Sequence, residues 1–172
     1  MLWPSTHRKA WQSAYASRRD PMREGREDAM SFKKILIAVD GSAIAARALD
    51  VAADLASDLR AHAALVHAVD PDLFGRGVDI APPEFEMTAQ QEGRALLADA
   101  RATFSCEVSV QQFIVQGSPG AEIVKTANEW GADLIAIGSH GRSGIGRAFV
   151  GSVAEFVMRH APCPVLVVRA KT

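Results

Sequence analysis

The 172-residue chain has two cysteines, one tyrosine and no long apolar run. Cys106 and Cys163 lack paired spacing and no apolar signal-peptide core precedes them, so we expect buried, reduced thiols and a cytoplasmic protein. No apolar stretch approaches the ~20 residues that a membrane-spanning helix requires, so no membrane association is expected.

The chain also lacks a large excess of positive or negative charge. The chain carries 19 lysines and arginines against 20 aspartates and glutamates, a net charge of -1. Without a long-range positive field, we expect no nucleic-acid partner. A chain of this length suits one domain with a sizeable core.

The residues that fast phosphoryl transfer usually requires are absent as well. The sequence has no Gly-x4-Gly-Lys-Ser/Thr loop, and no carboxylate follows the apolar run 133–137 as a metal-holding aspartate would. The histidines His62, His67 and His160 do not cluster with cysteines or acids at metal-ligand spacing. We therefore predict no metal site and assign no catalytic residue.

Residues 1–30 differ from the rest of the chain, because they hold two of the three tryptophans and the only tyrosine among basic residues. We interpret them as an N-terminal extension that is disordered or loosely docked. A short helix is an alternative, because His7, Trp11 and Tyr15 follow at i+4 spacing. The segment weakly resembles a targeting peptide, and Met30 is a candidate translation start.

From residue 31 to residue 172, strand and helix patterns alternate, which predicts an α/β domain with an open parallel sheet. The predicted strands are 34–39, 63–69, 107–115, 133–137 and 164–169, and the predicted helices are 43–59, 84–103, 118–130 and 152–160. Ser42 and Ser118 suit helix N-caps, and Gly131 suits a helix end. The loop 70–83 is either a lid or a spacer.

Ligands of such sheets bind beyond the carboxyl ends of the strands, so Asp40, Val69 and Gly138 are expected to share one crevice. The Asp40 carboxylate suits ribose hydroxyls, although it could instead cap the helix 43–59. Backbone groups of Ala38, Val39 and Val69 are candidates to read an adenine edge.

A phosphate cradle is predicted by the glycine spacing after residue 137. Gly138, Gly141 and Gly151 let an anion approach the backbone, and Ser152 and Val153 open a helix whose N–H groups point at it. Ser152 equally suits a structural N-cap.

The same loop carries cationic side chains. Arg142 and Arg147 either add charge-assisted contacts or stay solvated, and His140 either touches a phosphate or packs in the turn.

These residues resemble the ATP-binding type of the universal stress protein family, whose Gly-x2-Gly-x9-Gly-Ser/Thr motif is matched by Gly138, Gly141, Gly151 and Ser152. Three further stretches carry the resemblance, namely Ile35–Ser42, Gly131–Gly144 and His160–Val168.

The resemblance implies a Rossmann-like sheet of order 3-2-1-4-5 with helices on both faces. It also implies that ATP or AMP binds over the glycine loop, with any Mg²⁺ held by the phosphates, and a homodimer paired through Val165–Val168. The implied role is a nucleotide-dependent regulator of stress response. A weak ATPase or phosphotransferase and a nucleotide-free dimeric interaction module remain alternatives, so whether the protein is an enzyme stays open.

Overall fold

A computed structural model describes residues 32–70, 83–140 and 150–169. The described residues belong to one compact unit that begins at Phe32. The predicted extension 1–30, the loop after Asp70 and the segment that holds Gly141, Arg142 and Arg147 lie outside the described residues.

Five parallel strands form one sheet of order β3-β2-β1-β4-β5. The strands are β1 (Lys34–Ala38), β2 (His62–Val69), β3 (Val110–Gln116), β4 (Leu134–Gly138) and β5 (Val165–Val168). The apolar runs of β1, β2 and β4 suit strands that are covered on both faces. The predicted class and strand order are confirmed.

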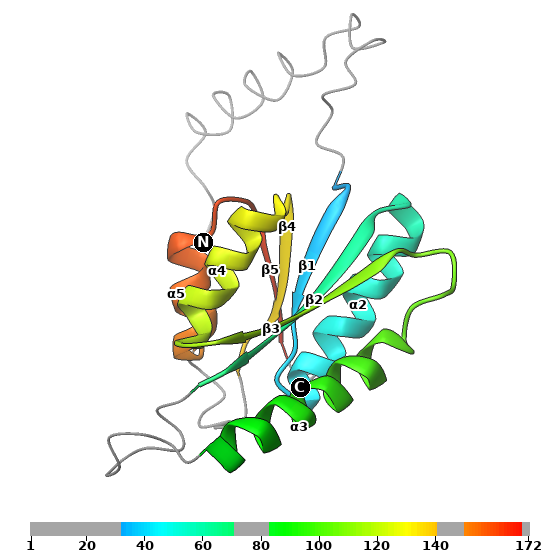
Figure 1. Ribbon diagram of the computed structural model, residues 1–172. Coiled ribbons are helices and arrows are strands. Elements are labelled where there is room, and N and C mark those ends of the chain that lie inside the picture. The colour runs from blue at the N-terminus through cyan, green and yellow to red at the C-terminus, as the bar shows by residue number, and fades with distance from the viewer. Residues whose placement is uncertain (1–31, 71–82, 141–149, 170–172) are drawn as a thin grey trace, which may run out of the picture. The chain divides into compact units, whose positions relative to one another are not determined.

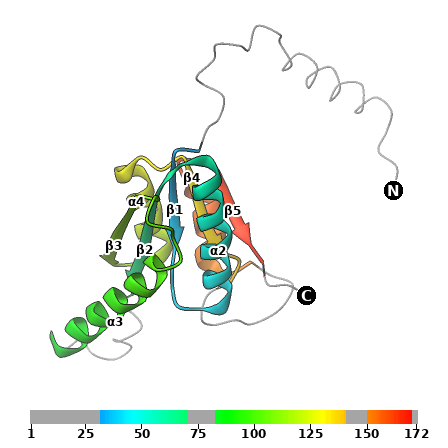
Figure 2. The same ribbon diagram turned by 90° about the vertical axis from the view of Figure 1, so that its right-hand side faces the viewer.

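Helices cover both faces of the sheet, α2 and α3 on one side and α4 and α5 on the other (Figure 1). The four helices in the described part of the chain are α2 (Ala43–Leu59), α3 (Pro83–Arg101), α4 (Pro119–Trp130) and α5 (Ser152–His160). Figure 2 shows the sheet from the side covered by α2 and α3, with the strands spread from β3 on the left to β5 on the right. Alternate residues of β1 enter the two cores, Ile35 and Ile37 under α2 and Leu36 under α4 and α5. No described helix is long and apolar enough to cross a bilayer.

Local cap signals explain several helix boundaries. The Ser42 hydroxyl accepts the N–H of Ala45 at 3.1 Å, which confirms Ser42 as the N-cap of α2. Gly131 ends α4 with φ 71°, a left-handed conformation that glycine adopts without strain. Ser118 occupies the N-cap position of α4 before Pro119, but its side chain makes no capping hydrogen bond.

The prediction was wrong between residues 101 and 110. Helix α3 ends at Arg101 and β3 begins only at Val110, not at 107. The Arg101 guanidinium donates to the carbonyls of Phe104 and Val108 at 3.2 and 3.5 Å, and both of these residues are buried. The apolar residues of this stretch therefore anchor a turn under the sheet instead of extending β3.

Candidate functional site at the strand ends

Strand β1 lies between β2 and β4, and the three strands are parallel, so their carboxyl ends lie at one edge of the sheet. Asp40 follows the end of β1, Val69 ends β2 and Gly138 ends β4. This juxtaposition was expected from the sequence. It places an acidic side chain, an apolar strand end and a glycine turn where ligands of open α/β sheets bind.

Asp40 is held in a tight turn between β1 and α2. Its Oδ1 accepts the N–H of Ser42 at 2.9 Å, and Gly41 between them has φ 81°. Ser42, and not Asp40, caps α2. The carboxylate is half-buried and stays next to the strand end.

Val39 is already engaged by β2 through both of its backbone groups. Its N–H donates to Val66 O at 2.9 Å, and its carbonyl accepts from Nδ1 of His67 at 2.8 Å. Sequence reasoning missed this role of His67. A signal was present, because a histidine inside an otherwise apolar buried strand needs a hydrogen-bond partner.

The other two residues predicted to contact a base are also placed at the strand ends. Ala38 is the last residue of β1 and is buried under α4 and α5. Val69 ends β2, and its carbonyl accepts the N–H of Gly117 at 3.0 Å.

Gly138 is crowded by α2. A Cβ built on Gly138 would lie 3.0 Å from Ile44 Cγ2 and 3.1 Å from the backbone nitrogen of Ala45. The close approach of β4 to the first turn of α2 therefore requires glycine here, independently of any ligand.

The two ends of the glycine-rich segment are tied together by a backbone hydrogen bond. The N–H of Gly151, at the N-terminus of α5, donates to Ser139 O just after β4 at 2.7 Å. Ser139 is itself 2% exposed, and its N–H donates to Val168 O at 2.7 Å. The described residues that precede and follow the segment 141–149 therefore lie next to each other.

Gly151 is the N-cap residue of α5, so the expectation that Ser152 caps this helix was wrong. Ser152 is the first helical residue and is exposed, Val153 is half-buried, and among the described residues no side chain makes the N-cap hydrogen bond. A helix that starts without a side-chain cap presents its first N–H groups to another acceptor.

His140 is partly buried beside this tie. Its Nδ1 lies 3.1 Å from Ser139 Oγ, and its Nε2 is buried without a hydrogen-bond partner among the described residues. The other predicted members of the loop, Gly141, Arg142 and Arg147, fall in the undescribed segment.

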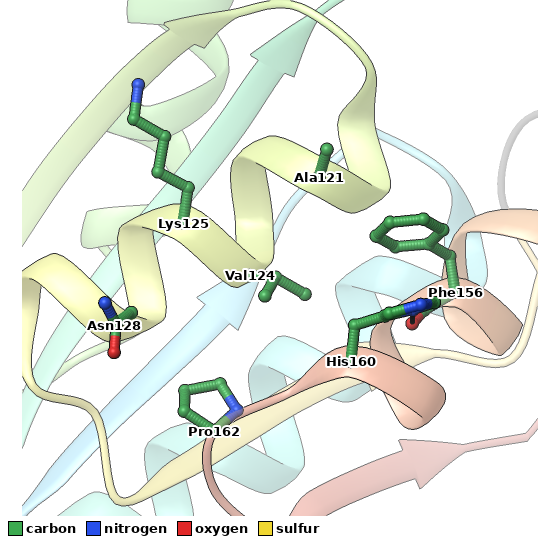
Figure 3. Close-up of a pocket in the computed structure, with 7 residues that line it drawn as sticks. All are labelled: Ala121, Val124, Lys125, Asn128, Phe156, His160 and Pro162. Carbon is green, nitrogen blue, oxygen red and sulfur yellow. Dashed lines mark hydrogen bonds between the residues drawn. The ribbon is translucent and has the colours of Figure 1, made fainter.

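A hollow of about 410 Å³ lies away from the strand ends, between α4 and α5. Figure 3 shows Val124 facing Phe156 and His160 across this hollow. The rings of Phe156 and His160 stack with centroids 4.2 Å apart, and a Cβ on Gly120 would lie 2.8 Å from Phe156 Cδ1. This hollow is therefore part of the interface where α4 and α5 pack closely against each other.

Another hollow, of about 290 Å³, borders the site. It is lined by the ends of β2 and β3 and by α3, and Val69 forms part of its wall together with Gln90, Arg94, Ile114, Val115 and Gln116. The described residues contain no cluster of three or more His, Cys, Asp or Glu residues arranged to bind a metal ion.

Comparison with known proteins identifies relatives over nearly the whole described region. The model of the universal stress protein family matches residues 31–169. Universal stress protein YxiE of Bacillus subtilis is 34% identical over 147 residues, covering 80% of this chain and 99% of the relative.

Solved structures agree with the sequence relatives. Hypothetical protein MJ0577 superposes with a TM-score of 0.75 at 30% identity, over 83% of this chain and 99% of the other. The universal stress protein from Archaeoglobus fulgidus, solved in complex with dAMP, has a TM-score of 0.56 at 26% identity, over 80% and 98% of the two chains.

Proposed function

Because this chain belongs to the universal stress protein family, we propose that it binds an adenine nucleotide, ATP in particular, at the ends of β1, β2 and β4. We propose further that it acts as a nucleotide-dependent regulator in a cytoplasmic stress response. The observation that carries the proposal is the Gly151-to-Ser139 hydrogen bond, which brings both ends of the Gly-x2-Gly-x9-Gly-Ser motif to the N-terminus of α5.

The phosphates would occupy the N-terminus of α5. The N-cap glycine supplies no competing side-chain acceptor, and the N–H groups of Ser152 and Val153 carry the positive end of the helix dipole. In this proposal Gly141 and Arg142 complete the cradle. The buried Nε2 of His140 supports a phosphate contact, because a phosphate oxygen would supply the acceptor that the described residues do not. Any Mg²⁺ would be held by the phosphates.

The nucleoside would extend toward β1 and β2. Asp40 is anchored by Ser42 through Oδ1 and is suited to accept from the ribose hydroxyls. Ala38 and Val69 would flank the base, with Val39 contributing its carbonyl, since a carbonyl oxygen that already accepts from His67 has a second lone pair. Support comes from the dAMP complex of the Archaeoglobus fulgidus relative.

We also propose that the protein is a homodimer paired through β5. β5 is an edge strand of four apolar residues, whereas the opposite edge, β3, exposes Gln111, Gln112 and Gln116. An apolar strand edge is normally covered in a soluble protein, and a second copy would cover this one.

Titration calorimetry with ATP and with AMP tests the nucleotide site. Asp40→Asn keeps an oxygen that accepts the Ser42 N–H but removes the charge, so it should retain the fold and weaken ATP binding about tenfold. Asp40→Ala should weaken it further and also spare the fold. Asp50→Asn, on the exposed side of α2, changes the net charge equally and should leave the affinity unchanged.

Two outcomes would contradict the proposal. Wild-type protein that binds neither nucleotide, with none carried through purification, removes nucleotide-dependent regulation altogether. If wild type binds ATP but both Asp40 variants bind it equally well, the ribose lies elsewhere.

A further inference from the structure

His67 is a buried side chain that the proposed nucleotide contacts do not use. It lies in β2, is 9% exposed, and its Nδ1 is 2.8 Å from Val39 O, across 28 residues of sequence. Because a carbonyl can only accept, Nδ1 carries the proton and donates it. The backbone N–H of Val39 is bonded to β2 as well, at 2.9 Å from Val66 O.

The Val39 carbonyl belongs to the peptide unit that begins Asp40. A trans peptide is planar, so the hydrogen bond from His67 also fixes the plane in which the Asp40 N–H lies. On the other side of Asp40, its Oδ1 accepts the Ser42 N–H at 2.9 Å. Asp40 is therefore held between two hydrogen bonds, one from a β2 side chain and one from the cap of α2.

The imidazole ring is itself confined by α3. A Cβ built on Gly93 would lie 2.9 Å from His67 Cδ2 and 3.7 Å from Ile114 Cδ1. The ring thus packs directly against the backbone of α3 at a position where no side chain intervenes. This contact limits the space into which the ring could turn away from Val39.

We propose that His67 is a positioning residue for the nucleotide site: its hydrogen bond to the Val39 carbonyl sets the orientation of Asp40. The affinity part of this inference rests on the proposed function. Its structural part, the immobilised turn between β1 and α2, stands without a ligand.

The test compares three variants of the full chain. His67→Leu removes the donor at similar volume, whereas in His67→Asn the side-chain amide nitrogen stands where Nδ1 was and can still donate. Thr126→Val is the matched control, because Thr126 is 6% exposed and its Oγ1 donates to Glu122 O at 2.7 Å within α4. Each variant is measured by thermal unfolding, by ATP titration calorimetry and by hydrogen exchange of the Ser42 amide.

We expect His67→Leu to weaken ATP binding about five- to tenfold, the range of one neutral hydrogen bond, and to speed exchange of the Ser42 amide. His67→Asn should restore the affinity to within about twofold of wild type. Thr126→Val should lower stability alone, with affinity and Ser42 exchange unchanged.

The inference is overturned if His67→Leu binds ATP as wild type does, or if Ser42 exchange is the same in His67→Leu and Thr126→Val. It is also overturned if His67→Asn is as impaired as His67→Leu. Wild-type protein without ATP affinity would instead refute the proposed function, and Ser42 exchange alone would then decide the role of His67.

Discussion

Gly138 lies against the backbone of Ala45, so that a Cβ on Gly138 would stand 3.1 Å from the Ala45 nitrogen. The glycine at the head of the phosphate motif is therefore also the point where β4 meets the first turn of α2. A backbone atom cannot rotate away from a clash as a side-chain end can. Glycine at position 138 is therefore required for the packing of β4 against α2, whether or not a ligand is bound.

Gly138→Ala should lower the free energy of unfolding by about 1–3 kcal/mol, the usual cost of overpacking a tight contact. The measurement is a urea titration followed by circular dichroism. Combining it with Ile44→Ala removes the Cγ2 contact at 3.0 Å but leaves the backbone contact, so rescue should be partial. A variant as stable as wild type would show that α2 moves aside at no cost.

Helix ends could be predicted from the sequence where the residues that fix them lie within a few positions of the end. Ser42 before α2 and Gly131 after α4 have the roles expected from their residue types. The strand pattern and its order followed from apolar runs and from the family resemblance. The start of β3 was misplaced because Arg101 bonds carbonyls several residues away and stabilises a turn.

The meeting of the strand ends could be predicted from the sequence, but the hydrogen-bond and packing partners of the residues there could not. That Val39 is already bonded on both sides depends on a histidine in the next strand, and that Gly138 is crowded depends on the position of α2. Both facts arise from tertiary packing, which a single sequence does not encode as a pattern. The N-cap of α5 is Gly151, one residue before the predicted Ser152, for a related reason. The N–H of Gly151 donates to Ser139 O, a contact between residues that are distant in the sequence.

The two cysteines should differ in reactivity. Burial, and secondarily the negative charge of Asp133, raises the pKa of the Cys163 thiol above its ordinary value of 9.0, whereas Cys106 is exposed. At pH 8 Cys106 should react with a disulfide reagent faster than Cys163, because the thiolate is the nucleophile. Rates followed by mass spectrometry distinguish the two sites.

Asp133→Asn should speed modification of Cys163 and leave Cys106 unchanged. The amide oxygen can still accept the N–H groups of Lys33 and Lys34 that Asp133 now accepts at 2.8–3.2 Å. Because folding raises this thiol's pKa, its contribution to stability is present below pH 9.0 and declines as the pH rises past it. Equal rates at both cysteines would contradict the burial argument.

Proline substitutions in β5 test the proposed dimer. Pro164 O accepts the N–H of Ile135 in β4, and Val168 O accepts the N–H of Ser139 just after β4. The backbone groups of alternate residues, including Val167, therefore face away from β4. Val167→Pro should remove an outward N–H, keep the fold and convert the dimer to a monomer in size-exclusion chromatography with light scattering. Leu166→Pro should instead unfold the strand. A monomeric wild type would refute the dimer.

The contact between Gly93 and His67 determines whether Gly93→Ala raises or lowers the free energy of unfolding. Gly93→Ala in the middle of an ordinary helix would add about 0.5–1 kcal/mol of stability, because alanine loses less conformational freedom than glycine. Here the new Cβ would stand 2.9 Å from His67 Cδ2, so the ring must move. We expect a net loss of about 1–2 kcal/mol, with weaker ATP binding as Nδ1 withdraws from Val39.

A double-mutant cycle with His67→Ala separates the two effects. With the ring removed, no remaining atom comes nearer to the new Cβ than Ile114 Cδ1 at 3.7 Å, an ordinary van der Waals contact. In that background Gly93→Ala should therefore stabilise the protein by about 0.5–1 kcal/mol. The reversal of sign, measured by urea unfolding, identifies the imidazole as the group that demands glycine in α3. If Gly93→Ala has the same sign in both backgrounds, α3 does not confine His67.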